Sequence, residues 1–593
     1  MKKYDVLLNI LDKIRAEAAS TQRASKYLPE PADIDSLNQA RARAFIHLLL
    51  KVKFGLLDFT EREHFITDGA NDGGIDGYYI DSETKLIYFI QSKFRTTESN
   101  FINKQIALEE LLATDVTRIV EGHEVDENGN GYNGKIFQLQ REIRQIDEIA
   151  RYKYKMIVLA NLESSTPDKL SRLVGGFSCE TINYERCFET LVFPVISGTY
   201  FKAADLVIHL DLSNKNAGSK ISYTVDTRYG ECDITVLFVP TIEIARTFHK
   251  YKNAMLEFNP RSYLELEGAK VNNAIRDTIL QQGKNEFALY NNGITMLSDE
   301  TYLNERIGQR NKARLNVKNP QIINGGQTAY TLSRIYEEGD PEKIGAVFEG
   351  KEVLLKIITV ASQNGDGDDK KRKLIDSISV ATNDQTAVIP ADRYSNDLIH
   401  VRLQKELFER YGLLYERKRG EFADGVHKGY IGRSQIIERN LFFRIYLASH
   451  GEINQAVERK AFIRFSKSGK EMPSLNTLDR FYFGYLCSFA LGNPIEARFW
   501  RKDKEVHGQI YAMTTLYMPP ILDDFESALA NNKEQFLARW QSFLETMQAK
   551  NERFLKSKVD RTTGESISFF QFQKWFRSNQ FEEDVKSFFG SNL

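Results

Sequence analysis

The chain has 593 residues, of which 42% are hydrophobic and 11% aromatic, and its formal net charge is −1. This composition excludes a largely disordered chain, and the overall charge gives no general attraction for nucleic acid, so any such attraction must come from local clusters of Lys and Arg. A chain of this length is expected to form about three or four domains.

Cysteine usage and hydropathy indicate the compartment. The four cysteines are scattered without CxxC spacing, which argues against a structural zinc site and against a secreted disulfide framework. The opening stretch MKKYDVLLNILDKIRAEAAS is amphipathic and not typical of a signal peptide. No apolar run approaches the ~20 residues of a membrane span. We therefore expect a cytoplasmic protein with no membrane contact.

Residues 1–55 are predicted to be helical, including an Ala- and Leu-rich helix from about Asn38 to Phe54. A β-hairpin is predicted next, because residues 75–80 and 85–93 are rich in Ile, Tyr and Phe and are separated by four polar residues. This hairpin is the stretch of the chain that carries the clearest chemistry.

The register of the hairpin determines which polar side chains meet. A tight four-residue connection places Asp76 opposite Phe89, and Gln91 and Lys93 share the face of Phe89 because strand side chains alternate with period two. Asp76 is then diagonal to Gln91, at about 7–8 Å between backbones. One divalent cation can bridge that separation. On these residues alone, a surface hairpin with an ordinary Asp turn and a terminal Lys is an equally good interpretation.

The combination of Gly74-Ile75-Asp76, a hairpin and Gln91-Ser92-Lys93 resembles the PD-(D/E)XK nuclease superfamily in its QxK variant, as in Mrr-like restriction enzymes. The resemblance implies a catalytic site in which Asp76 and Gln91 hold Mg²⁺, with Mn²⁺ as a substitute. It also implies that Lys93 positions or helps to deprotonate the attacking water and offsets charge on the phosphate.

Nucleases of this superfamily often carry another acid on the helix before the GxD motif, and the helix QARARAFIHLLLKVKF carries none. Asp72, four residues before Asp76, is the expected replacement as a metal ligand and catalytic residue. Glu61, Glu63 and Asp68 are weaker candidates, and a solvated turn is the better interpretation of the two glutamates.

After Lys93 we expect a helix from about Glu98 to Glu121, the Gly- and Asn-rich loop GHEVDENGNGYNG, and a second helix to about Arg151. The strand KMIVLANL and a further helix would complete an α/β core. Residues 1–215 are therefore predicted to form a restriction-endonuclease-like domain.

Residues 216–450 are predicted to form a second α/β domain, and Asn/Gly clusters punctuate it. In NPQIINGGQT an extended run leads into a helix N-terminus, which can bind a phosphate or carboxylate; a strand-to-helix turn with a side-chain cap is the simpler interpretation. The candidates for nucleic-acid or ligand binding are Arg261, Asn291, Asn292, Asn324, Gly325, Gly326, Gln327, Thr328 and Arg393. Structural cross-linking is the leading interpretation for Asn291 and Asn292, and a surface ion pair is the commoner fate of the two arginines.

Five motifs carry a second resemblance. FNPRSYLE, LYNNGIT, NPQIINGGQT, ATNDQ and GLLYERKRGEF occur in this order over about 200 residues, and together they resemble the AIPR (abortive infection phage resistance) family. The resemblance implies a prokaryotic defence role. Members commonly place a PD-(D/E)XK-like segment with an ITDGxxDxGID run ahead of these motifs, and residues 66–76 match that run. Residues 451–593 read as a mainly helical, aromatic-rich domain.

The sequence therefore predicts an α/β (α+β) multidomain protein that acts as a Mg²⁺-dependent DNA endonuclease in antiphage defence. We expect a homodimer, because one QxK centre cuts one strand at a time, and other defence proteins as partners. Two alternatives stay open: a nucleic-acid-binding or regulatory module with a weak site, and a ribonuclease that causes growth arrest.

Overall fold

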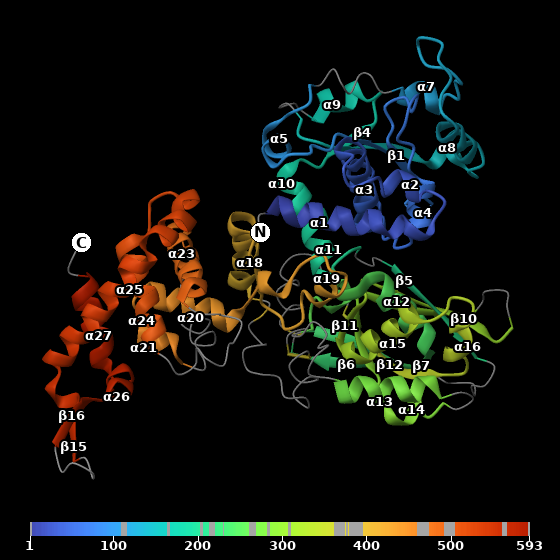
Figure 1. Ribbon diagram of the computed structural model, residues 1–593. Coiled ribbons are helices and arrows are strands. Elements are labelled where there is room, and N and C mark those ends of the chain that lie inside the picture. Colours follow the sequence, from blue (N-terminus) through green and yellow to red (C-terminus); the bar gives the residue numbers. More distant parts are fainter. Residues whose placement is uncertain are drawn as a thin grey trace. The chain divides into compact units, whose positions relative to one another are not determined.

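The structure is a computed structural model, drawn in Figure 1. It describes residues 3–82, 84–107, 115–162, 167–201, 205–212, 220–228, 230–259, 269–281, 285–305, 310–360, 374, 377–378, 395, 397–458, 474–491, 504–559 and 566–590. Within these residues no helix is both long and apolar enough to cross a membrane.

The chain divides into two compact units. The first comprises Met1–Gln385 with Arg419–Gly432, and the second comprises Thr386–Lys418 with Arg433–Leu593. The predicted boundary at residue 215 falls outside the described residues, in a part of the chain that belongs to the first unit. The division into three domains at 215 and 450 stays a prediction. The coarser expectation, a multidomain chain of mixed α and β structure, is confirmed.

The N-terminal part of the first unit is built on a four-stranded sheet of order β1-β2-β3-β4. β1 and β2 are antiparallel, whereas β2, β3 and β4 are mutually parallel. Its strands are β1 (Gly77–Asp81), β2 (Leu86–Ser92), β3 (Lys153–Leu159) and β4 (Ser178–Thr181). Its helices are α1 (Lys3–Ala16), α2 (Ala24–Tyr27), α3 (Ile34–Phe54), α4 (Phe59–His64), α5 (Glu98–Asn103), α7 (Val116–Val120), α8 (Gly134–Arg144), α9 (Pro167–Leu173), α10 (Tyr184–Cys187) and α11 (Phe193–Ser197).

The two faces of this sheet are covered by different helices. α3 packs on one face, where Phe54 stacks on Tyr79 with ring centroids 4.3 Å apart. α7 and α8 pack on the other face, where Tyr78 and Phe89 belong to one buried core with apolar side chains of both helices. The end of β2 therefore lies between two layers of helices. This packing holds in place the polar residues that follow the strand.

α3 is well defined at both ends. The Asp33 side chain accepts a hydrogen bond from the Ser36 N–H, and Gly55 ends the helix in the left-handed conformation. Between these caps, the second half of the helix is buried almost all round. Such burial makes α3 a rigid support for the residues that it presents to the edge of the sheet.

The hairpin register differs from the prediction by two residues. Asp81 pairs with Leu86 and Gly77 with Ile90, so continuing the register places Asp76 opposite Gln91 rather than Phe89. The turn explains the shift: Asp81 stays in the strand and accepts a hydrogen bond from the Thr84 N–H at 3.1 Å. A shift of two keeps every side chain on its predicted face, and it brings Asp76 and Gln91 directly across from each other.

The helix predicted from Glu98 to Glu121 is wrong as a single element. α5 ends at Asn103, and Ile106 then forms an isolated parallel bridge with Leu162. The Ile106 N–H donates to the Asn161 carbonyl at 2.9 Å, so an extended residue stands where the prediction continues the helix. The next predicted helix, α8, ends at Arg144 and not near Arg151.

The remainder of the first unit contains two further sheets, of order β5-β10-β9 and β11-β8-β12-β7-β6. Their strands are β5 (Asp205–Asp211), β6 (Ile221–Thr227), β7 (Gly230–Pro240), β8 (Ile294–Ser298), β9 (Glu300–Asn304), β10 (Lys312–Lys318), β11 (Gln321–Asn324) and β12 (Glu352–Thr359). The helices are α12 (Thr241–Tyr251), α13 (Ala269–Leu280), α14 (Phe287–Tyr290), α15 (Gly326–Glu338), α16 (Ile344–Phe348) and α19 (Ala423–His427). One buried core of aliphatic and aromatic side chains joins them.

The second unit is mainly helical in the described residues, as the sequence predicts for the C-terminal part. Its helices are α18 (Leu398–Tyr411), α20 (Arg439–Ser449), α21 (Ile453–Ala456), α23 (Leu475–Leu491), α24 (Lys504–Tyr517), α25 (Phe525–Lys550), α26 (Phe572–Phe576) and α27 (Asn579–Gly590). Short strands pair as β13 (Leu414–Glu416) with β14 (Ile436–Glu438) and as β15 (Leu555–Val559) with β16 (Ser566–Phe570). Most of its described Phe and Trp side chains are buried in the core.

Candidate metal centre

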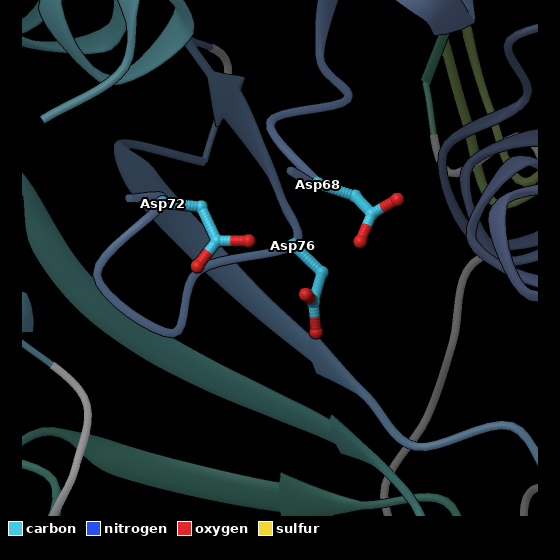
Figure 2. Close-up of side chains that lie close together, drawn as sticks. All are labelled: Asp68, Asp72 and Asp76. Atoms are coloured by element: carbon cyan, nitrogen blue, oxygen red, sulfur yellow. The ribbon is translucent and has the colours of Figure 1, made fainter. Parts of the chain in front are cut away.

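Three aspartates gather at the edge of the first sheet. One carboxylate oxygen of Asp68, one of Asp72 and one of Asp76 all lie within 4.8 Å of one another. In Figure 2 the three side chains come from one continuous stretch of chain that leads into β1. Within the described residues, this is the only group of three His, Cys, Asp or Glu side chains that could hold a metal ion.

Asp76 is held against the end of β2. Its N–H donates to the Ile90 carbonyl at 2.8 Å, and its carboxylate accepts a hydrogen bond from the Ser92 N–H at 2.6 Å. Burial raises the pKa of this carboxyl to about 7, and the charges of Asp72 and Asp68 contribute to the rise. The site therefore has a strong preference for an added positive charge, either a proton or a metal ion.

Asp72 is fixed by the backbone of its own loop. One carboxylate oxygen accepts from the Gly74 N–H at 2.9 Å and the other accepts from the Gly69 N–H at 3.1 Å. Gly73 and Gly74 both have positive φ, 62° and 76°, so glycine suits this turn. Burial raises the pKa of Asp72 as well.

Asp68 completes the group from the segment on the outer side of β1. Ile66 forms an antiparallel bridge with Gly77, and the Asp68 N–H donates to the Asp76 carbonyl at 3.1 Å. Its carboxylate is paired with the guanidinium of Arg43, with Nε and Oδ2 2.8 Å apart. The part of α3 that the sequence shows to lack an acid therefore contributes a guanidinium cation, which holds one of the three carboxylates.

The hairpin residues Gln91 and Lys93 lie at the same end of β2. Gln91 is only 3% exposed, and its Oε1 accepts no hydrogen bond from any described residue. Lys93 is exposed, and its positive charge opposes the rise that burial causes in the pKa of both Asp76 and Asp72. The alternation of the strand gives Gln91 and Lys93 the same face.

The two glutamates considered from the sequence are not part of this group. Glu63 accepts hydrogen bonds in a cluster with Tyr27 and His47, and burial lowers the pKa of His47 to about 4. Glu61 is exposed in the first turn of α4. The sequence places Asp68 with these glutamates among the weaker candidates and does not predict Arg43. The ITD run before the loop is the signal that pointed to Asp68.

These residues fit a small hard cation. Mg²⁺ is bound by oxygen ligands, commonly one or two carboxylates with several waters. The aspartate group offers carboxylate oxygens at compatible spacing, and the buried Gln91 oxygen is an acceptor without a donor among the described residues. Asp68, Asp72, Asp76 and Gln91 are therefore the residues that would hold such an ion.

The Asn/Gly motifs of the first unit have a different character. The Asn291 side chain accepts from the Gly293 N–H at 2.9 Å and donates to Thr328 Oγ1 at 3.1 Å. It thus links the turn before β8 to the first turn of α15. Asn292 is exposed. Asn324 accepts from the Gly325 N–H at 2.7 Å.

Two glycines allow these turns to approach each other. Gly293 and Gly325 have φ of 83° and 82°, and a Cβ on Gly325 would lie 2.7 Å from the Gly293 carbonyl oxygen. Gly326 begins α15, and the Gln327 amide donates to Asn272 Oδ1 at 2.9 Å. These contacts are made within the protein. Arg261 and Arg393 lie outside the described residues.

The fold and the aspartate group define a multidomain protein of mixed α and β structure with a candidate divalent-cation site near its N-terminus. Residues 256–556 match the family model described as AIPR protein, which is half of the 593-residue chain. The chain belongs to the AIPR family. This membership supports a role in abortive infection and antiphage defence. No curated protein and no solved structure gives a significant match.

Proposed function

We propose that the chain is a Mg²⁺-dependent nuclease, a DNA endonuclease that serves as the effector of an abortive-infection system. The observation that carries the proposal is a convergence at one end of β2. Three carboxylates meet there. Gln91, which lies opposite Asp76 in the register, has a buried oxygen with no donor among the described residues, and the positive charge of Lys93 acts on Asp76. The AIPR membership supplies the defence context.

The chain's own residues would divide the work as follows. Asp68, Asp72 and Asp76 would hold the cation, with Gln91 as an additional oxygen ligand. A bound Mg²⁺ would polarise the scissile phosphate and favour ionisation of a coordinated water. Lys93 would orient the attacking water and offset the negative charge that develops on the phosphate.

The electrostatics of the site favour this role over a purely structural one. Three neighbouring carboxylates repel one another, and burial raises the pKa of Asp76 to about 7. Such an arrangement lowers the free energy of unfolding. Clustered charges with strongly shifted pKa values are typical of functional sites. A divalent cation satisfies all three carboxylates together.

A homodimer is part of the proposal. Within the described residues the chain offers one such aspartate group, and one centre cuts one strand at a time. Two chains acting on one duplex would give a double-strand break.

One observation favours a second candidate, a nucleic-acid-binding or regulatory module without turnover. Arg43 already pairs with Asp68, and an ion pair that persists would leave two carboxylates for the cation. The two candidates predict different outcomes with the same substrates.

The test is a substrate panel. Purified full-length protein is incubated with supercoiled plasmid, linear duplex, single-stranded DNA and RNA, each with Mg²⁺, with Mn²⁺ or with EDTA. The proposal predicts cleavage of duplex DNA with either cation and none in EDTA. Cleavage of RNA alone would show that the substrate is RNA and not DNA. Cleavage that persists in EDTA would refute the metal-dependent mechanism. Tight binding without turnover under every condition would establish the second candidate.

A further inference from the structure

A polar cavity lies against the loop that carries Asp72. Its volume is about 570 Å³, within the range of pockets that bind small molecules and cofactors. Asn71, Gly73 and Gly74 form one wall, whereas the side chain of Asp72, between them, turns toward Asp76 (Figure 2). One loop therefore separates the cavity from the aspartate group.

The other walls come from segments that the proposed nuclease mechanism does not use. They are the start of α7, the Gly- and Asn-rich loop around residues 126–132 and the end of α9. The wall from α7 is tied to the site loop, because the Asp115 N–H donates to the Gly73 carbonyl at 2.8 Å. The cavity thus belongs to the same packed region as the candidate metal centre.

Two arginines supply positive charge to the cavity. Arg118 donates from Nη2 to the Val125 carbonyl at 3.1 Å and to the Asp126 carbonyl at 3.4 Å, and its buried Nε has no acceptor among the described residues. Arg172 is exposed at the rim, and no ion pair or hydrogen bond to it is found in the part of the chain that the structure describes. Both guanidinium groups can therefore donate to a ligand.

The cavity also offers acceptors and a ring. Tyr132 is nearly buried and donates its hydroxyl to Asp115 Oδ2 at 2.9 Å. Asp126, Glu127 and Asn128 lie on the facing loop, so the cavity has three acids beside its two arginines. These carboxylates would repel a ligand that has acidic groups alone. An apolar ligand would leave the polar groups of the cavity without hydrogen-bond partners. A phosphate joined to a base, which both donates and accepts hydrogen bonds, matches the mixture.

We infer that this cavity receives one nucleotide of the DNA strand that is cut at the aspartate group, unstacked from its neighbours. The inference rests on the proposed function, and it adds a contact that determines where the strand lies. The arginines would hold the phosphate and the base edge, and the Asp115–Tyr132 pair would line the base. Enzymes that take a nucleotide out of the stack bind it in a pocket and read the base by hydrogen bonds to its edge.

The experiment follows unstacking directly. Duplex oligonucleotides carrying 2-aminopurine at successive positions are bound to full-length protein in EDTA, so that binding is observed without metal-dependent cleavage. The fluorescence of 2-aminopurine rises when the base leaves the stack. We expect a rise at one position, and we expect Arg118→Gln and Arg172→Gln to suppress it and to weaken binding by roughly tenfold.

Matched controls separate this effect from loss of fold or of general charge. Arg144→Gln removes a guanidinium from α8 that donates to the Gly122 carbonyl at 3.4 Å and does not line the cavity, so it should retain the fluorescence signal. Arg172 is exposed, so its variant should unfold at the same temperature as the wild type even if Arg118→Gln is less stable.

The outcomes distinguish the two proposals. Metal-dependent cleavage without any 2-aminopurine signal, or a signal that both cavity variants retain, would overturn the cavity inference and leave the nuclease standing. A signal that the cavity variants suppress, in a protein that cuts nothing, would overturn the nuclease and keep the nucleotide site. Loss of the fluorescence signal in Arg144→Gln as well would show that the signal depends only on the overall positive charge of the region. This outcome would also overturn the inference.

Discussion

The Asp-rich loop of residues 68–76 and the two Asn/Gly turns of the first unit, at Asn291–Gly293 and Asn324–Thr328, use polar residues in opposite ways. The Asn/Gly turns satisfy their polar groups with one another, as when Asn291 links the Gly293 N–H to Thr328. The Asp-rich loop places three carboxylates together, and burial lifts the pKa of Asp76 to about 7. Amides that bond to one another indicate a structural role, whereas clustered carboxylates with a raised pKa indicate a site for a cationic ligand.

The largest expected effect is on catalysis. Asp76→Asn should lower DNA cleavage by at least roughly 10³-fold, because it removes the central carboxylate of the proposed cation site. Asp81→Asn is the matched control, since Asp81 lies at the other end of β1 and should keep near wild-type activity. Initial rates on plasmid DNA with saturating Mg²⁺ measure both. Equal rates for Asp76→Asn and wild type would remove Asp76 from the site.

The next effect is on folding, at the Asn/Gly turns. Gly325→Ala should lower the free energy of unfolding by about 2–4 kcal/mol, because φ is positive and the new Cβ would clash with the Gly293 carbonyl. Gly350 has φ 68°, and a Cβ at this position would meet nothing within 4 Å, so Gly350→Ala should cost only about 1 kcal/mol. Urea unfolding of both variants tests the difference. Equal losses would show that the close approach contributes nothing.

The hairpin shows how far the sequence alone can predict the site. Period-two alternation predicts that Asp76, Gln91 and Lys93 share a face, and a register error of two leaves this prediction unchanged because it does not change faces. The register itself depends on one turn, in which Asp81 accepts from Thr84 and Lys85 takes a φ of 56°. Neither property can be read from composition.

Asp68 and Arg43 show what pattern reasoning misses. The segment before the loop pairs with β1 through a single bridge, Ile66 with Gly77, and one bridge leaves no alternating pattern to detect. Arg43 comes from a helix whose sequence suggests only packing, yet it reaches Asp68 at 2.8 Å. Contacts of this kind depend on tertiary placement, which is why the sequence ranks Asp68 below Asp72 and does not predict Arg43.

A third prediction concerns stability without metal. Burial raises the pKa of Asp76 from 3.8 to about 7, so the folded protein binds this proton more tightly than the unfolded chain. Stability should therefore fall as the pH rises from about 4 to about 7. In EDTA at pH 8, Asp76→Asn should raise the free energy of unfolding by about 1–3 kcal/mol, and at pH 5 the gain should shrink. Denaturant titrations at both pH values measure it, and an Asp76→Asn protein less stable than wild type at pH 8 would contradict the account.

The smallest effect separates the two asparagines. Asn291→Ala should cost about 1 kcal/mol, because it leaves the Gly293 N–H and Thr328 without their shared partner. Asn292 is exposed, so Asn292→Ala should change stability by less than about 0.5 kcal/mol. Thermal unfolding of the pair distinguishes them. A larger loss for Asn292→Ala would assign that residue a contact beyond those described.

The central claim is that the three aspartates form a cation site. Calorimetric titration of the full-length, metal-free protein with Mn²⁺ tests it most directly, with Asp76→Asn and Asp81→Asn titrated in parallel. The account predicts binding of Mn²⁺ by the wild type and by Asp81→Asn, and loss of that binding in Asp76→Asn. Absence of binding to the wild type, or undiminished binding to Asp76→Asn, would contradict it.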